Sequence, residues 1–217
     1  YEANTIELAA DQVFGSERYP LGLNAPRAIA RGIQADLYIA DSRNHRILQI
    51  ASDGSLLRQV GSFADAFTGD APIGTFNEPW GVAVGPDGSV YVSDTWNHRI
   101  QKFTQDLTPV KMWGQYGQPV PGDSASAGSF WGPRGIAVDA NGNVLVADTG
   151  NKRIVVFDKD GNYITEFGTA GFDPGQFDVL GVGGQAGAGA DPEVEDPPAR
   201  PTEEPFAGLS SAHPLHG

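Results

Sequence analysis

A short segment with the pattern Asp-x-x-Asn-x-Arg-Ile occurs three times in the chain, at nearly equal intervals. The copies begin at Asp41, Asp94 and Asp148, so the intervals are 53 and 54 residues. A period of this length indicates repeated supersecondary units, each of which buries its apolar surface against its neighbours. This repeat constrains the fold more than any other feature of the sequence.

Each copy lies among four short apolar segments, two before the Asp and two after the Arg. These segments begin in the three copies at Pro26, Pro79 and Pro133, at Leu37, Val90 and Val144, at Ile47, Ile100 and Ile154, and at Leu56, Pro109 and Tyr163. Asp87-Gly88 and Asn141-Gly142 separate the first two segments and supply the positive φ of a tight hairpin turn. The first copy has Arg31 to Asp36 there instead. We therefore predict an all-β fold, a β-propeller of four-stranded antiparallel blades.

The predicted blades cover residues 20–72, 73–126 and 127–178, and residues 62–78 and 115–132 connect successive blades across one face. Residues 1–19 are expected to form part of a preceding blade or a closing strand. Residues 179–217 hold seven Gly, six Pro and six acidic residues against one basic residue. That composition predicts a tail that is disordered or read out of frame. Since closed propellers have roughly four to eight blades, we expect a fragment that self-associates to complete a ring.

The overall charge and composition disfavour several classes of function. The formal net charge is −13, and the 14 Lys and Arg residues are scattered, which disfavours binding to nucleic acid. The absence of cysteine excludes thiol chemistry and disulfides. Direct membrane insertion is not expected, because no long apolar run is present. The compartment stays open, with an extracytoplasmic or membrane-anchored parent protein favoured.

The repeated segment, with its preceding Val90-Tyr-Val-Ser and Pro79-Trp-Gly-Val-Ala-Val, resembles the NHL repeat family over roughly residues 20–178. The resemblance implies a propeller, commonly of six blades. Members of the family range from protein-binding and RNA-binding modules to a metal-associated amidating lyase and relatives of sugar-lactone hydrolases. The RNA-binding members use a basic face, which this acidic chain lacks. The fold by itself cannot choose among these functions.

The residues favour a binding function over catalysis. The repeat region contains two histidines, His45 and His98, at one position of the repeat where the third copy has Lys152. A metal-ligand position would not tolerate lysine, so we expect no metal and no cofactor. We predict a non-catalytic scaffold or sensor module of a bacterial multidomain protein, which contacts a protein or glycan. The alternative is a fragment of a lyase or lactone hydrolase whose metal site lies on missing blades.

The polar residues that every copy repeats are expected to be structural, because each blade needs them whereas a catalytic group is needed once. A carboxylate at a strand end can accept backbone N–H groups, and an arginine can bridge carbonyls in the next turn. These residues are Asp41, Asn44, Arg46, Asp94, Asn97, Arg99, Asp148, Asn151 and Arg153.

Positions at which the copies differ are freer to contact a ligand. Two such positions carry large side chains: the residue after the repeated Pro, and the third residue of the Asp-x-x-Asn segment. An aromatic ring beside arginine suits recognition of an anionic, sugar-like or peptide ligand. We therefore predict a ligand-contact set of Arg27, Arg43, Trp80, Trp96 and Arg134.

Overall fold

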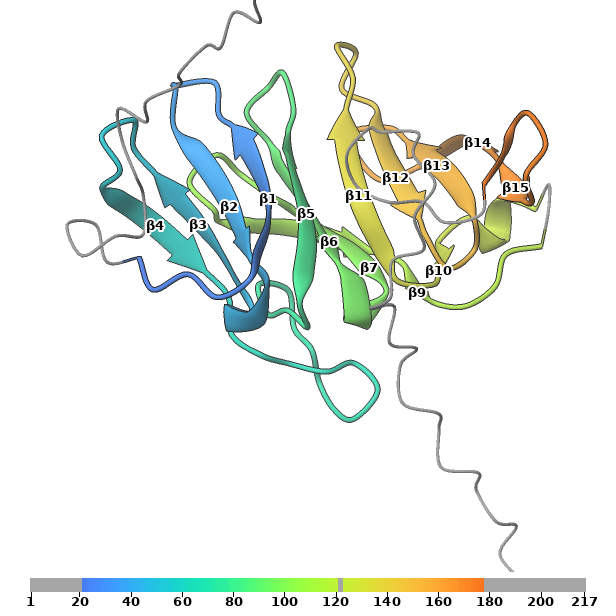
Figure 1. Cartoon of the computed structure of the whole chain (residues 1–217), viewed down its shortest axis with the longest axis horizontal. Coiled ribbons are helices and arrows are strands. Elements are labelled where there is room, and N and C mark those ends of the chain that lie inside the picture. The colour runs from blue at the N-terminus through green and yellow to red at the C-terminus, as the bar shows by residue number, and fades with distance from the viewer. Residues whose placement is uncertain (1–20, 121–122, 178–217) are drawn as a thin grey trace, which may run out of the picture. The chain divides into compact units, whose positions relative to one another are not determined.

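A computed structural model describes residues 21–120 and 123–177, and these residues form an all-β structure. Three four-stranded antiparallel sheets follow one another along the chain (Figure 1). Blade 1 consists of β1 (Pro26–Arg31), β2 (Leu37–Asp41), β3 (Arg46–Ile50) and β4 (Leu56–Val60). Blade 2 consists of β5 (Pro79–Val84), β6 (Val90–Asp94), β7 (Arg99–Phe103) and β8 (Pro109–Trp113). Blade 3 consists of β11 (Pro133–Val138), β12 (Val144–Asp148), β13 (Arg153–Phe157) and β14 (Tyr163–Phe167).

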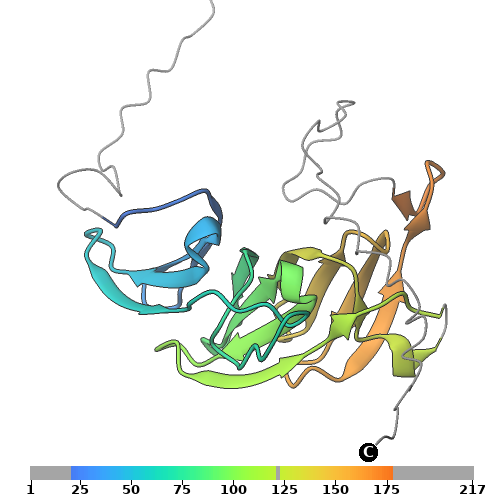
Figure 2. The ribbon, with the colours of Figure 1, turned by 90° about the horizontal axis from the view of Figure 1, so that it is seen from below.

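The first strands of the three blades lie side by side, with β5 between β1 and β11. Seen from a second direction, the blades follow one another in sequence order (Figure 2). This is the arrangement of a β-propeller, so the predicted fold class is confirmed. One end of every sheet carries the two hairpin turns of its blade, and we call this end the turn face. The opposite end, the loop face, carries the short 3₁₀ helices η1 (Ser42–Asn44) and η2 (Thr95–Asn97) together with the connections between blades.

The core lies between neighbouring blades, because each sheet is apolar on both sides. In β6, Val90 and Val92 pack against blade 1, whereas Tyr91 between them packs against blade 3. Alternate residues of a strand point to opposite sides of its sheet. A central blade therefore needs a nearly continuous apolar second strand, and the alternating hydrophobic pattern of a one-sided sheet would not suffice.

The connections between blades contain structure that the sequence did not reveal. β9 (Gln115–Tyr116) pairs in parallel with β10 (Ser129–Phe130), and between them lies η3 (Ser124–Ser126). β15 (Thr169–Ala170) and β16 (Gln176–Phe177) form the corresponding parallel pair after blade 3. In the first connection the same contact is a single parallel bridge from Phe63 to Phe76. Each of these three segments thus folds back onto itself after the fourth strand of its blade.

The position that ends each fourth strand requires glycine for steric reasons. Gly114 has a φ of +100°, and a Cβ there would lie 2.5 Å from the ring of Phe130. Only glycine combines this backbone conformation with such a close approach. Phe130 can therefore enter the core between blades 2 and 3, where it is fully buried.

The partial blade or closing strand expected over residues 1–19 and the tail expected over residues 179–217 lie outside the described residues.

Candidate functional site

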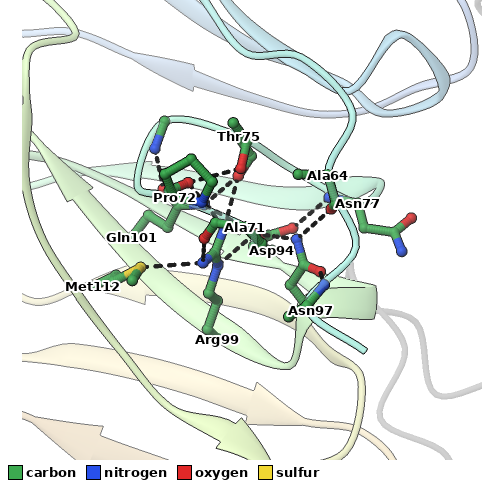
Figure 3. Close-up of polar contacts among 12 residues, drawn as sticks. Ala64, Ala71, Pro72, Thr75, Asn77, Asp94, Asn97, Arg99, Gln101 and Met112 are labelled. Carbon is green, nitrogen blue, oxygen red and sulfur yellow. Dashed lines mark hydrogen bonds and ion pairs between the residues drawn. The ribbon is translucent and has the colours of Figure 1, made fainter. Parts of the chain in front are cut away.

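The repeated Asp, Asn and Arg form one hydrogen-bond network at the loop face of each blade, which blade 2 shows most fully (Figure 3). Asp94 is completely buried at the end of β6. Its Oδ1 accepts the backbone N–H of Asn77, and its Oδ2 accepts hydrogen bonds from Asn97, Arg99 and Gln101. Burial raises the pKa of Asp94, while Arg99 and Asn97 oppose that shift.

The outer part of this network holds the connection that precedes the blade. Arg99 donates to the carbonyl oxygens of Ala71, Pro72 and Thr75, three points on the segment between β4 and β5 (Figure 3). Asn97 donates to the carbonyl of Ala64 and accepts the N–H of Ala66. These bonds satisfy backbone groups of a long connection that would otherwise have no regular partner.

Blades 1 and 3 have the same core of the network with fewer outer contacts. Asp41 accepts from Asn24 N, Asn44 and Arg46, and Asp148 accepts from Trp131 N, Asn151 and Arg153; all six bonds lie between 2.7 and 3.0 Å. Both aspartates are completely buried. The Arg46 side chain is 21% exposed, against 6% for Arg99 and 4% for Arg153. The network of blade 1 is therefore the most open to solvent of the three.

The two repeat histidines link one blade to the next. His45 Nδ1 accepts the N–H of Glu78 at 3.1 Å, and His98 Nδ1 accepts the N–H of Gly132 at 2.9 Å. Both histidines, like Lys152, have a positive φ near 50–56°. Burial lowers the pKa of His98 to about 4, so the ring is neutral and its Nδ1 is an acceptor near pH 7.

A β-bulge reorients the residue after each repeated Pro. In blade 1, Pro26 pairs with Asp41 and Ala28 with Ala40, so Arg27 is the extra residue. Trp80 is the extra residue in blade 2, and the irregularity in blade 3 includes Arg134. An extra residue in one strand bends the strand and redirects the side chain. The sequence places these three residues at the same repeat position, and the bulge turns them toward one another.

Trp80 lies between the two arginines. The Arg27 guanidinium carbon is 3.7 Å from the centre of the Trp80 ring, and that of Arg134 is 4.2 Å from it. Because β1 and β11 flank β5 on opposite sides, the two guanidinium groups cover opposite faces of the indole. Trp96 meets Trp80 edge to face at 6.2 Å. We call these four residues the arginine–tryptophan cluster.

The structure thus brings together four of the five residues predicted to contact a ligand. The fifth, Arg43, is exposed on η1, and within residues 21–120 and 123–177 no ring contact or ion pair joins it to the cluster. Its counterpart in blade 3 is Gly150, where a Cβ would lie 2.5 Å from the ring of Trp131. Packing of Trp131 therefore explains why the third copy has glycine at this position.

Two features of the loop face were missed from the sequence. The first is an aromatic row: Phe63 packs on His45, and Phe67 and Tyr116 pack on each other and on His98. Phe63 is 60% exposed and Phe67 54%. The second is a hydroxyl after the repeated Asp, where Ser42 donates to Pro79 O and Thr95 to Pro133 O. The position directly after the repeated Asp is occupied by Ser42, Thr95 and Thr149. The recurring hydroxyl could have indicated this contact from the sequence.

Within the described part of the chain, no group of three or more His, Cys, Asp or Glu could hold a metal ion. The same residues contain no helix long and apolar enough to cross a membrane.

Four-stranded blades with adjacent first strands define a β-propeller protein. The NHL repeat family model matches residues 76–103 and 130–157, the second and third copies of the repeat. The chain therefore contains NHL repeats at these two positions, as the sequence predicted.

Curated relatives include an NHL repeat-containing protein, and a solved structure shares the fold. NHL repeat-containing protein 3 of Mus musculus is 33% identical over 119 residues, which cover 54% of this chain and 32% of that protein. Protein brain tumor of Drosophila melanogaster is 29% identical over 134 residues, or 44% of this chain and 13% of that protein. The chain thus spans about a third or less of these two relatives. A solved structure of Kuenenia stuttgartiensis hydrazine synthase has a TM-score of 0.50 at 17% identity, covering 68% of this chain and 36% of that one, which shows the fold alone.

Proposed function

We propose that the chain is a non-catalytic binding module that holds a segment of a partner protein on its loop face. The observation that carries this proposal is the arginine–tryptophan cluster, in which three neighbouring first strands each direct a large side chain to one place. Arg27 is exposed, and Trp80, Trp96 and Arg134 are half-buried. Rigid aromatic rings beside arginine are the side chains that most often dominate protein interfaces.

The charge of the cluster suggests the kind of segment. Two guanidinium groups lie together in a chain with a net charge of −13. Stacking on an indole occupies the flat face of a guanidinium group, while its N–H groups point outward in the plane. An aspartate or glutamate carboxylate matches that planar donor pattern. We therefore propose an acidic peptide segment, with Arg43 on η1 as an outlying contact.

Selection of displayed peptides on the immobilised chain tests the proposal. We expect enriched sequences to carry Asp or Glu next to an apolar residue. Their synthetic versions should bind about tenfold or more weakly to Trp80→Ala and to Arg27→Ala, which corresponds to at least about 1.4 kcal/mol. Lys111→Ala, on the turn face, is the matched control and should leave binding unchanged. Peptides that bind Trp80→Ala as tightly as the parent chain would refute the proposal.

We also propose that chains associate through the outward side of blade 3. Leu145 and Ile154 lie on the side away from the core shared with blade 2, and they are only half-buried. The same side of blade 2 is apolar and covered by its neighbour. Light scattering at micromolar concentration should give a mass above 22.9 kDa, the mass of one chain. Leu145→Lys should lower it, and a monomeric parent chain would contradict the proposal.

A further inference from the structure

A polar pocket of about 310 Å³ opens on the turn face between blades 1 and 2. It is far from the loop face in the direction of the strands, since the turns lie at the opposite end of every sheet. Blade 1 and the turn after β7 of blade 2 supply its walls. The lining residues are all polar: Gln34, Gln49, Arg58, Thr104, Gln105 and Asp106.

The corresponding place between blades 2 and 3 is filled by two lysines. Lys102 and Lys111 occupy the repeat positions of Gln49 and Arg58. Lys102 Nζ donates to the carbonyl of Lys159 at 2.7 Å and lies 3.9 Å from the Asp160 carboxylate. Lys111 Nζ donates to the carbonyl of Asp160. Two ammonium groups of the chain thus satisfy the acceptors of the turn in blade 3.

The turn in blade 2 presents the same acceptors without these ammonium groups. Gln105 and Asp106 correspond to Lys159 and Asp160, and Tyr38 donates to the Gln105 carbonyl as Tyr91 does to that of Lys159. A carbonyl oxygen has two lone pairs, and at the second junction the lysine uses the other one. Within the described residues, neither Gln49 nor Arg58 donates a hydrogen bond to this turn.

Gln49 and Arg58 are instead held within blade 1. Gln49 Nε2 donates to Asp36 Oδ2 at 2.6 Å and to the Tyr38 hydroxyl at 3.0 Å, and Arg58 donates to Gln49 Oε1 at 3.4 Å. Gln49 is 4% exposed, so its side chain is fixed at the floor of the pocket. Behind it, Asp36 is 3% exposed and its Oδ1 has no hydrogen-bond partner.

The charges around the pocket favour a cation. Among the lining residues, Asp106 carries a negative charge and Arg58 a positive one, and the buried Asp36 behind Gln49 adds a second negative charge. Compared with the junction between blades 2 and 3, the junction between blades 1 and 2 lacks an alkylammonium group.

We propose that this pocket binds the primary ammonium group of a small molecule. The ammonium takes the place that the Lys102 ammonium has at the next junction, donating to the Gln105 carbonyl and the Asp106 carboxylate. The binding is reversible and involves no covalent step. This site is independent of the arginine–tryptophan cluster, because it lies at the other end of the sheets.

Titration of the ¹⁵N-labelled chain with n-butylammonium chloride tests the proposal. We expect saturable shifts of the backbone amide signals of Gln34, Thr104 and Gln105. Butan-1-ol and sodium butyrate, which have the same carbon chain without the positive charge, should produce no saturable shift. Asp106→Asn should weaken butylammonium binding about tenfold, the effect of losing one charge-assisted hydrogen bond.

Two variants exchange side chains between the two junctions of neighbouring blades. Gln49→Lys should fill the pocket with an internal ammonium and abolish butylammonium binding. The double variant Lys102→Gln/Lys111→Arg should open a second site and add saturable shifts at Asp158 to Asp160. Saturable butyrate binding would show an anion site at Arg58 and overturn the proposal, as would unchanged butylammonium binding to Gln49→Lys. Absence of any saturable shift in the parent chain would also overturn it, whatever the loop face binds.

Discussion

The two junctions between blades use the same strand positions but fill them differently. At the end of the fourth strand, blade 1 has Val60 where blade 2 has Trp113. Val60 packs against the core between blades 1 and 2, whereas Trp113 packs on Tyr91 and Phe157 between blades 2 and 3. The second junction also holds the lysine pair, while the first has an open pocket. The repeated residues thus specify a blade, and the non-repeated residues decide how completely neighbouring blades fill the space between them.

The largest expected difference between the junctions comes from removing these two side chains. Trp113→Ala should lower the free energy of unfolding by about 3–5 kcal/mol, because it deletes an indole that packs on two core rings. Val60→Ala should cost about 1–2 kcal/mol, since only two methyl-sized groups are lost. Urea denaturation measures both. Equal losses would mean that the two junctions are equally well packed.

The histidine contacts should give the next largest effect, through pH. The His98 pKa is about 4 in the folded chain, against 6.5 for the unperturbed group. Between these values the unfolded state binds a proton that the folded state does not, so stability falls as the pH drops from about 6.5 to about 4. The full loss is roughly 3 kcal/mol, and it ends below pH 4. Urea denaturation at a series of pH values measures it.

Two glutamine variants distinguish the contribution of His98 from that of His45 in the urea experiment. His98→Gln should remove most of the loss between pH 6.5 and 4, because the titrating ring is gone. His45→Gln, the matched change at the first junction, should leave the pH dependence attributed to His98 in place. An unaltered pH profile for His98→Gln would assign the loss to other groups.

The smallest expected effect concerns the contacts of Trp80 with its two arginines. Double-mutant cycles that combine Trp80→Ala with Arg27→Ala or with Arg134→Ala measure each coupling energy separately. We expect about 0.5–1 kcal/mol for the exposed Arg27 and up to about 2 kcal/mol for the half-buried Arg134, because desolvation strengthens cation–π interactions. A larger coupling for Arg27 would reverse this ranking.

The fold was predictable from the sequence because the blade is a local unit. The segments expected to begin at Pro109 and Tyr163 form strands that begin at those residues. Strand pairing within a blade joins neighbours in sequence through short turns, so periodicity and Asp-Gly or Asn-Gly signals suffice. The parallel pair β9–β10 was missed, because it consists of two residues on each side of a long connection.

The candidate site was only partly predictable. Comparison of the copies selected Arg27, Trp80 and Arg134, but nothing in their spacing showed that the two arginines would stack on one indole. That arrangement depends on bulges in three strands and on the lateral contact of β5 with its neighbours. The pocket on the turn face was not predicted, because it arises from the difference between Gln49 and Lys102 in contacts with another blade.

The sequence by itself determined the repeat, the four-stranded antiparallel blade and the resemblance to NHL repeats. These depend on local hydrogen bonding and on a pattern that occurs three times at a nearly constant interval. The tertiary structure alone decided which side chains from different blades meet. Contacts between blades join residues more than 30 positions apart, and their geometry depends on bulges, strand twist and the size of neighbouring side chains. The arginine–tryptophan cluster and the polar pocket on the turn face both arise from such contacts.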